Sequence, residues 1–463
     1  MPFYEPPRTH RLRNFLLTLL ALAIAALALA WLRGGRPHLT ASWPPAVGMH
    51  THLRLQARAG MGLASARIWY EQHGRRLPLL ARHWHGRNWW RSTRPRQVAL
   101  SIPVGRGDVP GLRDGDATLV ARFTTANLRR SRLTVRHRLV VRSVPPRLTA
   151  LTSQQYIVQG GAELLVYRAS SGTVRSGVRL AGDFFPGHRL PGAGKGIYFC
   201  LFAEPWNVRP PLHARLFGVD DAGNRTQIAF PLHAFAQRFR KRPPFLLTRE
   251  DLQRLLPPIL AHEPQLHAGA HLGPNFVLVD QTLAQSQLRQ LARLSRHSVH
   301  GFLWHGAFEP LPHAALEARF ADQRQFVYRG HVLDDEVHLG DDLASVRHTP
   351  IPAANAGRVM MASYFGIYGN AVVLDHGYGL MTLYGHMHDF AVKVGETVAK
   401  GQLLGHSDST GLALGDHVHF SVMVDGVMVN PLEWWDPHWI QAHLWTKLAK
   451  FGNTQTQPRR RPQ

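Results

Sequence analysis

An uninterrupted apolar segment lies near the N-terminus, at residues 15–32, and Thr18 is its only polar side chain. Eighteen residues rising about 1.5 Å each span about 27 Å, enough to cross the hydrocarbon core of a bilayer. Trp31 near its end is typical of an interfacial anchor. The pattern predicts that residues 1–36 form an uncleaved membrane anchor. A cleaved signal peptide is the alternative, since residues 28–30 read Ala-Leu-Ala, and both interpretations predict export.

Alternating apolar and polar positions follow, in short runs separated by turn residues. The run LTVRHRLVV at residues 133–141 is typical of a half-buried strand. Similar runs recur between residues 37 and 143, which predicts a β-rich, Ig-like domain there. A second β-rich, Ig-like domain is expected over residues 144–240. It ends in a DDAGN turn at residues 220–224, which resembles the final hairpin of extracellular Ig-like modules.

A helical linker region is predicted over residues 241–320. Thr248 precedes two acidic residues and is a candidate N-cap, and leucines at positions 283, 288, 291 and 294 fall near one helical face. We interpret that face as a packing surface; a mobile element covering an active groove is the alternative. An apolar stripe within residues 437–463 predicts a helix that docks on the protein, with contact to the membrane as the alternative, followed by a disordered basic tail.

Closely spaced strands and turns are expected between residues 350 and 432. His417 and His419 begin a strand that continues through FSVMV at residues 420–424. Residues two apart in a strand point to the same face. Both histidines are therefore expected to face one groove.

Composition narrows the choice of partners. The formal net charge is +24, with 54 Lys and Arg against 30 Asp and Glu, and such a field favours nucleic acid, phospholipid head groups or an anionic cell-wall polymer. No nucleic-acid-binding motif is present and the basic residues are spread along the chain, so we do not expect a nucleic-acid partner. The single cysteine, Cys200, excludes an intrachain disulfide.

Histidine pairs can arise by chance, so their number has to be compared with the random expectation before they are taken to indicate a metal site. With 29 His in 463 residues, about two HxH pairs are expected at random, and four occur. An HxH or HxxxD pattern alone is therefore weak evidence for a metal site. A hydrolytic zinc ion needs three N or O ligands and one open position. His338, Asp342 and one histidine of the 417/419 pair would supply that set, leaving the other histidine and His386 for proton transfer.

The surrounding sequence strengthens the evidence for a metal site. The segments that contain these residues resemble the lysostaphin-type, or LytM-domain, zinc endopeptidases that cut peptide bridges in peptidoglycan. The matching segments include HLGDD at 338–342, the hairpin at 370–386, the strand-turn-strand unit at 394–405, GDHVHF at 415–420 and VNPL at 429–432. They cover roughly the last quarter of the chain, in the family's order. The resemblance implies an antiparallel β-sheet peptidase domain at residues 321–436, and the protein as a whole is then mainly β.

The resemblance also implies roles for five residues. It assigns His338, Asp342 and His419 to a Zn²⁺ ion, and His386 and His417 to catalysis without metal contact. No HExxH motif is present, so a histidine must serve as base, and the sequence leaves open which of the two does so. Asp341 is expected to face solvent or to support the site, and His376 and His388 are interpreted as structural.

The chain departs from the family pattern at Asp408, where glycine is usual, and at Asp416, where proline is common. Neither position removes a ligand. The resemblance thus implies a membrane-anchored, exported zinc metalloendopeptidase that hydrolyses peptidoglycan cross-links. We expect it to be a single-pass protein of the inner membrane with its catalytic region in the periplasm. A non-catalytic cell-wall-binding scaffold or regulator of other wall hydrolases is the alternative.

Overall fold

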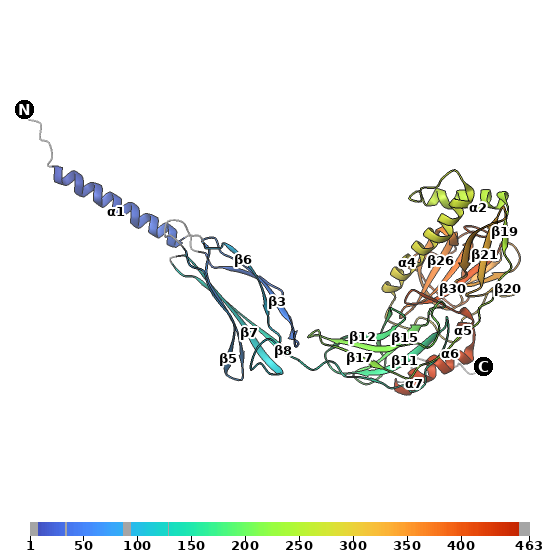
Figure 1. Ribbon diagram of the computed structural model, residues 1–463, viewed down its shortest axis with the longest axis horizontal. Helices are drawn as coiled ribbons and strands as arrows, with labels where there is room; N and C mark the ends of the chain where they lie inside the picture. Colours follow the sequence, from blue (N-terminus) through green and yellow to red (C-terminus); the bar gives the residue numbers. More distant parts are fainter. Residues whose placement is uncertain (1–7, 33–34, 87–93, 128, 453–463) are drawn as a thin grey trace, which may run out of the picture. The chain divides into compact units, whose positions relative to one another are not determined.

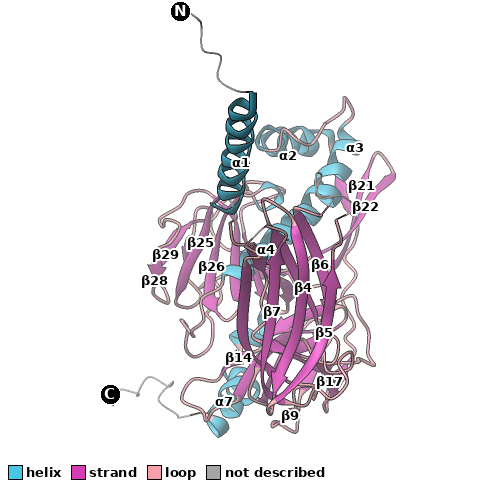
Figure 2. Cartoon of the chain, turned by 90° about the vertical axis from the view of Figure 1, so that its left-hand side faces the viewer, coloured by secondary structure: helices cyan, strands magenta, loops and turns pink. Residues whose placement is uncertain are grey.

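The computed structural model describes residues 8–32, 35–86, 94–127 and 129–452. Strands dominate these residues and helices are the minority (Figure 2), which confirms the expectation of a mainly β protein. The chain divides into two compact units. One holds the described residues up to Pro146 with two short excursions, Gly172–Val174 and Val219–Arg225, and the other holds the remainder. The basic tail expected after residue 452 lies outside the described residues.

The N-terminal apolar segment forms one helix, α1 (Arg8–Leu32), which is 25 residues long. Its stretch Leu12–Leu29 has a mean hydropathy of 2.1, and none of that stretch is buried. Within the described residues, α1 alone is long and apolar enough to cross a membrane. An apolar helix of this length and position fits a membrane anchor and a signal sequence alike.

The first unit contains a β-sandwich core. Buried side chains from two sheets, among them Leu53, Tyr70 and Phe123, form a single hydrophobic cluster. One sheet has the order β1-β3-β6 (His38–Ala41, His52–Arg58, Gln97–Pro103). The other has the order β2-β8-β7-β4-β5 (Ala46–Val47, Arg132–Val141, Gly115–Thr125, Leu63–Gln72, Arg75–His83). The Ig-like assignment of this sandwich stays a prediction.

The second unit begins with two four-stranded sheets and a small parallel ladder. The first sheet has the order β14-β15-β11-β9 (His188–Arg189, Ile197–Ala203, Ala162–Ala169, Leu148–Ala150). The second has the order β13-β12-β16-β17 (Asp183–Pro186, Thr173–Leu180, Arg215–Asp220, Arg225–Ala229). Strands β10 (Tyr156–Val158) and β18 (His233–Phe235) pair in parallel.

A helical segment follows strand β19 (Phe245–Leu247) and comprises α2 (Arg249–His262), α3 (Leu272–Val277), the π-helical turn η1 (Leu278–Leu283), α4 (Ala284–Leu294) and η2 (Ser295–His297). Thr248 is the N-cap of α2, as the sequence predicts, and it also forms a reciprocal capping box with Asp251. Leu291 of α4 is buried in a cluster with Met381 and Leu383 of the eight-stranded sheet that contains β27 (Leu380–Met387), so this helix does pack. Figure 1 shows α2 and α4 beside that sheet.

The sheet that carries the candidate chemistry has the order β20-β23-β30-β27-β26-β25-β28, and β31 extends β30. Its strands are Ala315–Ala318, Asp341–Ala344, Val418–Val424, Leu380–Met387, Asn370–Gly377, Gly357–Tyr364, Thr397–Val398 and Val427–Val429. The hairpin β21–β22 (Gln323–Tyr328, His331–Val337), the pair β24–β29 (Pro350–Pro352, Leu403–His406) and the turn η3 (Gly366–Tyr368) flank it.

Both faces of this sheet are covered, which explains its nearly continuous apolar strands. Odd-numbered positions of β27, such as Met381 and Leu383, face the cluster that includes α4. Leu380 and Tyr384 face a second cluster, which extends into the strands of residues 148–230. The sheet is therefore held from both sides, and rigid elements support the side chains that project from it.

The C-terminal stripe docks on the protein. Helices α5 (Pro431–Trp435), α6 (Pro437–Ile440), η4 (Gln441–Trp445) and α7 (Thr446–Phe451) follow the sheet. Ile440, Leu444 and Leu448 are buried in the cluster shared with β11 and β15. The apolar stripe thus packs against the protein and is not available for contact with a membrane.

Candidate metal centre

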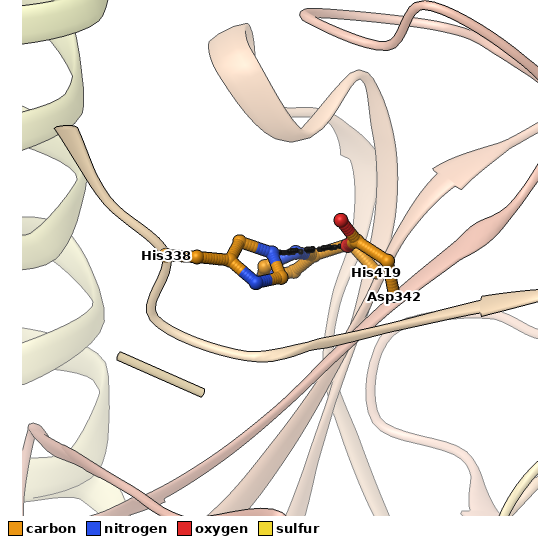
Figure 3. Close-up of side chains that lie close together, drawn as sticks. All are labelled: His338, Asp342 and His419. Atoms are coloured by element: carbon orange, nitrogen blue, oxygen red, sulfur yellow. Dashed lines mark hydrogen bonds and ion pairs between the residues drawn. The ribbon is translucent and has the colours of Figure 1, made fainter. Parts of the chain in front are cut away.

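Strand register brings two of the predicted ligands together. In the antiparallel pair β23–β30, Asp342 lies directly opposite His419, and residues opposite each other in such a pair project from the same face. Asp342 Oδ1 lies 3.1 Å from His419 Nδ1 and 3.0 Å from His338 Nε2. Figure 3 shows the three side chains converging on one point. The donor atoms of His338, Asp342 and His419 form a compact group that could hold a metal ion.

His338 reaches this point from the segment before β23. Its backbone is fixed by two hydrogen bonds: Ala321 N–H donates to the His338 carbonyl (2.7 Å) and His338 N–H donates to the Asp322 carbonyl (3.0 Å). Gly340 makes the approach possible, because a Cβ at this position would lie 2.6 Å from His419 Nε2 and 2.6 Å from the Phe420 carbonyl oxygen. The glycine of the HLGDD run therefore leaves space for the His419 ring.

Hydrogen bonds on the outer sides of the two rings define their tautomers. The Ser421 hydroxyl donates to the Leu339 carbonyl (2.8 Å), so its oxygen accepts from His419 Nε2, which lies 2.8 Å away. His338 Nδ1 faces the Arg319 carbonyl at 3.3 Å, and a carbonyl can only accept. Protons on these outer nitrogens leave His338 Nε2 and His419 Nδ1 as lone pairs, 2.9 Å apart.

This arrangement fits a divalent cation. Two imidazole lone pairs and one carboxylate oxygen face each other with no proton between them, and burial of all three residues excludes neutralisation by solvent. Burial lowers the pKa of His338, and burial lowers the pKa of His419 to about 4, so both rings are neutral near pH 7. Neutral imidazoles with a carboxylate are a ligand set typical of zinc.

Arg324 and Glu336 support the group from the hairpin β21–β22, where the two residues pair directly. The Arg324 guanidinium donates to Asp342 Oδ2 at 2.6 Å. Burial disfavours the charged form of Asp342, but its contacts with the three surrounding histidines outweigh burial and hold its pKa well below the usual range. The carboxylate is therefore ionised.

His386 and His417 lie beside this group. His386, the penultimate residue of β27, has a left-handed φ of +60°, which is unusual for a residue other than glycine, and its side chain lines the groove. Nδ1 of His386 donates to the Thr410 carbonyl (2.7 Å), and Nδ1 of His417 donates to the Gly415 carbonyl (2.9 Å). Their ring centroids are 4.7 Å apart. Each ring thus presents Nε2 to the groove.

Charge distinguishes these two rings. Burial, followed by the charges of His417 and His419, lowers the pKa of His386 well below its ordinary value. Burial also opposes the charged form of His417, but the hydrogen bond and charge of Asp342, whose Oδ1 is 3.4 Å from His417 Nε2, outweigh it and raise the pKa.

A cavity of about 1020 Å³ has all five side chains in its lining. The helical segment contributes to the same lining, through Leu255, Phe276, Asp280, Gln281, Ala284, Gln285 and Leu288. The helical segment therefore both packs against the sheet and lines the groove. Mobility of the helices stays a prediction.

Other histidines and acids occupy distinct places. Asp341 is fully buried and accepts from Phe320 N–H at 2.7 Å, so it supports the start of the site and does not face solvent. His376 is buried and lies between the Ala356 carbonyl and the Thr382 hydroxyl, 2.8 Å from each.

Sequence reasoning missed Arg324 and Ser421. Arg324 is one of 54 basic residues in the chain, so nothing in its local pattern distinguishes it. The position of Ser421, two residues after His419 on the same strand face, offered the only usable signal.

Comparison with known proteins identifies this region. The model of peptidase family M23 matches residues 336–431. DD-carboxypeptidase/endopeptidase Mpg of Neisseria meningitidis is 33% identical over 126 residues, which are 27% of this chain and 28% of that protein. Peptidoglycan DD-endopeptidase ShyC of Vibrio cholerae is 34% identical over 122 residues, 26% of this chain and 28% of that protein. The chain spans about 28% of the length of these curated relatives.

A solved structure assigned to peptidase M23, from Pseudomonas aeruginosa, covers 60% of this chain and 95% of its own, at 19% identity and a TM-score of 0.38. The family match covers His338 and the strands β23 and β30, which carry Asp342 and His419. Residues 336–431 of this chain are therefore a peptidase family M23 domain of the LytM type.

Proposed function

We propose that this protein is a membrane-anchored, exported zinc metalloendopeptidase that hydrolyses peptide cross-links of peptidoglycan. The observation that carries the proposal is the convergence of two imidazole lone pairs and Asp342 Oδ1 in a buried group. His338, Asp342 and His419 would hold the ion. Such an ion supplies Lewis acidity, which lowers the pKa of water and polarises a carbonyl.

The chain's own residues supply the proton transfer. His386 and His417 each engage Nδ1 with a backbone carbonyl, so Nε2 is the atom available in the groove. One Nε2 accepts the proton of the attacking water, and the other stabilises negative charge on the carbonyl oxygen. The surrounding helical residues reduce access of bulk water, which strengthens both interactions.

Peptidoglycan is the proposed substrate because the relatives of this domain include proteins named peptidoglycan DD-endopeptidase. The helix α1 suits an anchor that keeps the catalytic unit at the outer side of the inner membrane. The net charge of +24 favours attraction to an anionic wall polymer.

The test is digestion of purified peptidoglycan by the detergent-solubilised full chain, with released fragments identified by mass spectrometry. We expect cross-linked fragments to be cut, the activity to stop with a chelator, and Zn²⁺ to restore it. Asp342→Ala and His419→Ala should each abolish both zinc retention and cleavage. Arg289→Gln, an exposed change on α4, is the matched control and should cleave normally.

Zinc retention together with the absence of cleavage would favour the scaffold alternative. Cleavage that persists in both ligand variants would show that the metal site is assigned to the wrong residues.

A further inference from the structure

A second group of metal-binding side chains lies outside the candidate centre. It consists of His348, His388 and Asp408, whose ligand atoms all lie within 4.8 Å of one another. His388 Nδ1 lies 3.0 Å from Asp408 Oδ2, and the rings of His348 and His388 stand 4.4 Å apart at 83°. The group is partly exposed, with 51% of the His388 side chain accessible.

The three residues come from separate segments, and hydrogen bonds hold each in place. His348 N–H donates to Asp416 Oδ2 (3.1 Å), and Asp416 Oδ1 accepts from the Ser407 hydroxyl (2.6 Å). His388 N–H donates to the His406 carbonyl (2.8 Å). The convergence is therefore a product of the tertiary fold and not a chance meeting of flexible side chains.

A surface ion pair explains only part of this arrangement. The contact between His388 and Asp408 gives each of those two side chains a partner. It gives the His348 ring nitrogens none. Among the described residues, the ring nitrogens of His348 have no hydrogen-bond partner, and its backbone has a left-handed φ of +56°. A ligand shared with the neighbouring histidine and carboxylate would give the ring nitrogens of His348 a partner.

We propose that His348, His388 and Asp408 form a second, solvent-exposed site for a borderline divalent transition ion such as Zn²⁺. Two imidazoles and one carboxylate are a ligand set that suits this class of ion. Zinc bonds of about 2.0–2.1 Å place neighbouring ligand atoms about 3.3 Å apart, a spacing that small side-chain rotations reach from the present distances. Water completes the coordination on the exposed side, so binding is weaker than at the buried group.

Asp408 gives this site a link to the proposed catalytic histidines. Its N–H donates to the His386 carbonyl at 2.9 Å, and its carbonyl accepts from His417 N–H at 3.2 Å. An ion bound to the Asp408 side chain therefore stabilises the segment that positions both histidines.

The test is equilibrium dialysis of the metal-free, detergent-solubilised full chain against increasing Zn²⁺, with bound metal counted per chain. We expect two ions, one tight and one weaker. His388→Gln, His348→Gln and Asp408→Asn should each weaken the second ion at least tenfold and leave the tight one in place. His406→Gln is the matched control, since His406 forms a neighbouring exposed pair with Asp389 (3.0 Å) and should still bind two ions.

Visible spectra of the Co²⁺-loaded protein provide a second readout, because the weaker ion should add a band that the three variants lose. Near-ultraviolet circular dichroism identifies any variant that fails to fold, and the remaining variants decide. A wild-type chain that binds one ion overturns the proposal, as does a weaker ion whose affinity is unchanged in the folded variants. The measurement is independent of peptidase activity.

Discussion

Arg324 binds one oxygen of Asp342 while the other oxygen faces the site. The guanidinium lies 2.6 Å from Oδ2, and Oδ1 lies within 3.4 Å of nitrogens from three histidines. An arginine hydrogen bond fixes the plane of a carboxylate. The pair therefore holds Asp342 in an orientation that offers one oxygen to the proposed ion.

Replacing this arginine should weaken metal binding without removing a ligand. Arg324→Gln is expected to lower zinc affinity about 10- to 100-fold, the usual effect of losing a residue that orients a ligand. Arg324→Lys should recover part of the affinity, because the charge returns without the planar geometry. Competition with a chromogenic chelator measures both, and Arg289→Gln should match the wild type. Equal affinity in Arg324→Gln would contradict the orienting role.

Gly340→Ala should disrupt the site by steric displacement. The new Cβ would lie 2.6 Å from His419 Nε2, a distance at which the ring or the β23 backbone must move. We expect zinc retention and cleavage to fall at least tenfold. Gly301→Ala is the matched control, since nothing lies within 4 Å of a Cβ there. Full zinc retention in Gly340→Ala would contradict the expected clash between the new Cβ and the His419 ring.

Ser421→Ala should loosen His419 by removing the oxygen that accepts from Nε2. Without this partner the ring is free to adopt the other tautomer, which places a proton on the metal-facing nitrogen. We expect about tenfold weaker zinc binding, measured by the same competition assay. Ser421→Thr keeps the hydroxyl and should bind more tightly than Ser421→Ala; the reverse order would argue against a tautomer effect.

A buried carboxylate that is not part of the metal group predicts a pH-dependent stability. Glu204 is fully buried, neither of its oxygens has a hydrogen-bond partner among the described residues, and burial raises its pKa to about 8. The folded state then binds a proton that the unfolded state releases above about pH 4.5. This group's contribution is fully present below that pH and is lost as pH rises towards 8.

Glu204→Gln mimics the neutral acid and should remove this loss. The variant is expected to be more stable than the wild type at pH 8 by at least about 1.4 kcal/mol, the equivalent of one pKa unit, and equally stable near pH 5. Urea unfolding at the two pH values measures the difference. A stability difference that does not change with pH would be inconsistent with a protonated Glu204.

The C-terminal helices should depend on one buried ion pair. Glu163 is fully buried, and its carboxylate accepts from Lys447 Nζ at 2.6 Å. Lys447→Met leaves that charge with weaker partners and should destabilise the protein by roughly 3 kcal/mol, measured by urea unfolding. Lys450→Met, on the same helix and exposed, should change stability by less than about 0.5 kcal/mol. Similar effects of the two substitutions would mean that docking of α7 does not rest on this pair.

Local sequence was sufficient for features that depend on neighbouring residues. The apolar segment that forms α1, the N-cap at Thr248 and the placement of His417 and His419 in one groove all follow from periodicity or short-range hydrogen bonding. The mainly β class follows in the same way, from alternation within each run.

Tertiary structure decided what depends on distant segments. The pairing of Asp342 with His419, the contact of Arg324 with Asp342 and the group at His348 each join residues from separate strands or loops. Local patterns carry no information on strand register or on which outer partner fixes a tautomer. The sequence by itself therefore named the five candidate side chains, while only the fold determined which of their atoms face one another.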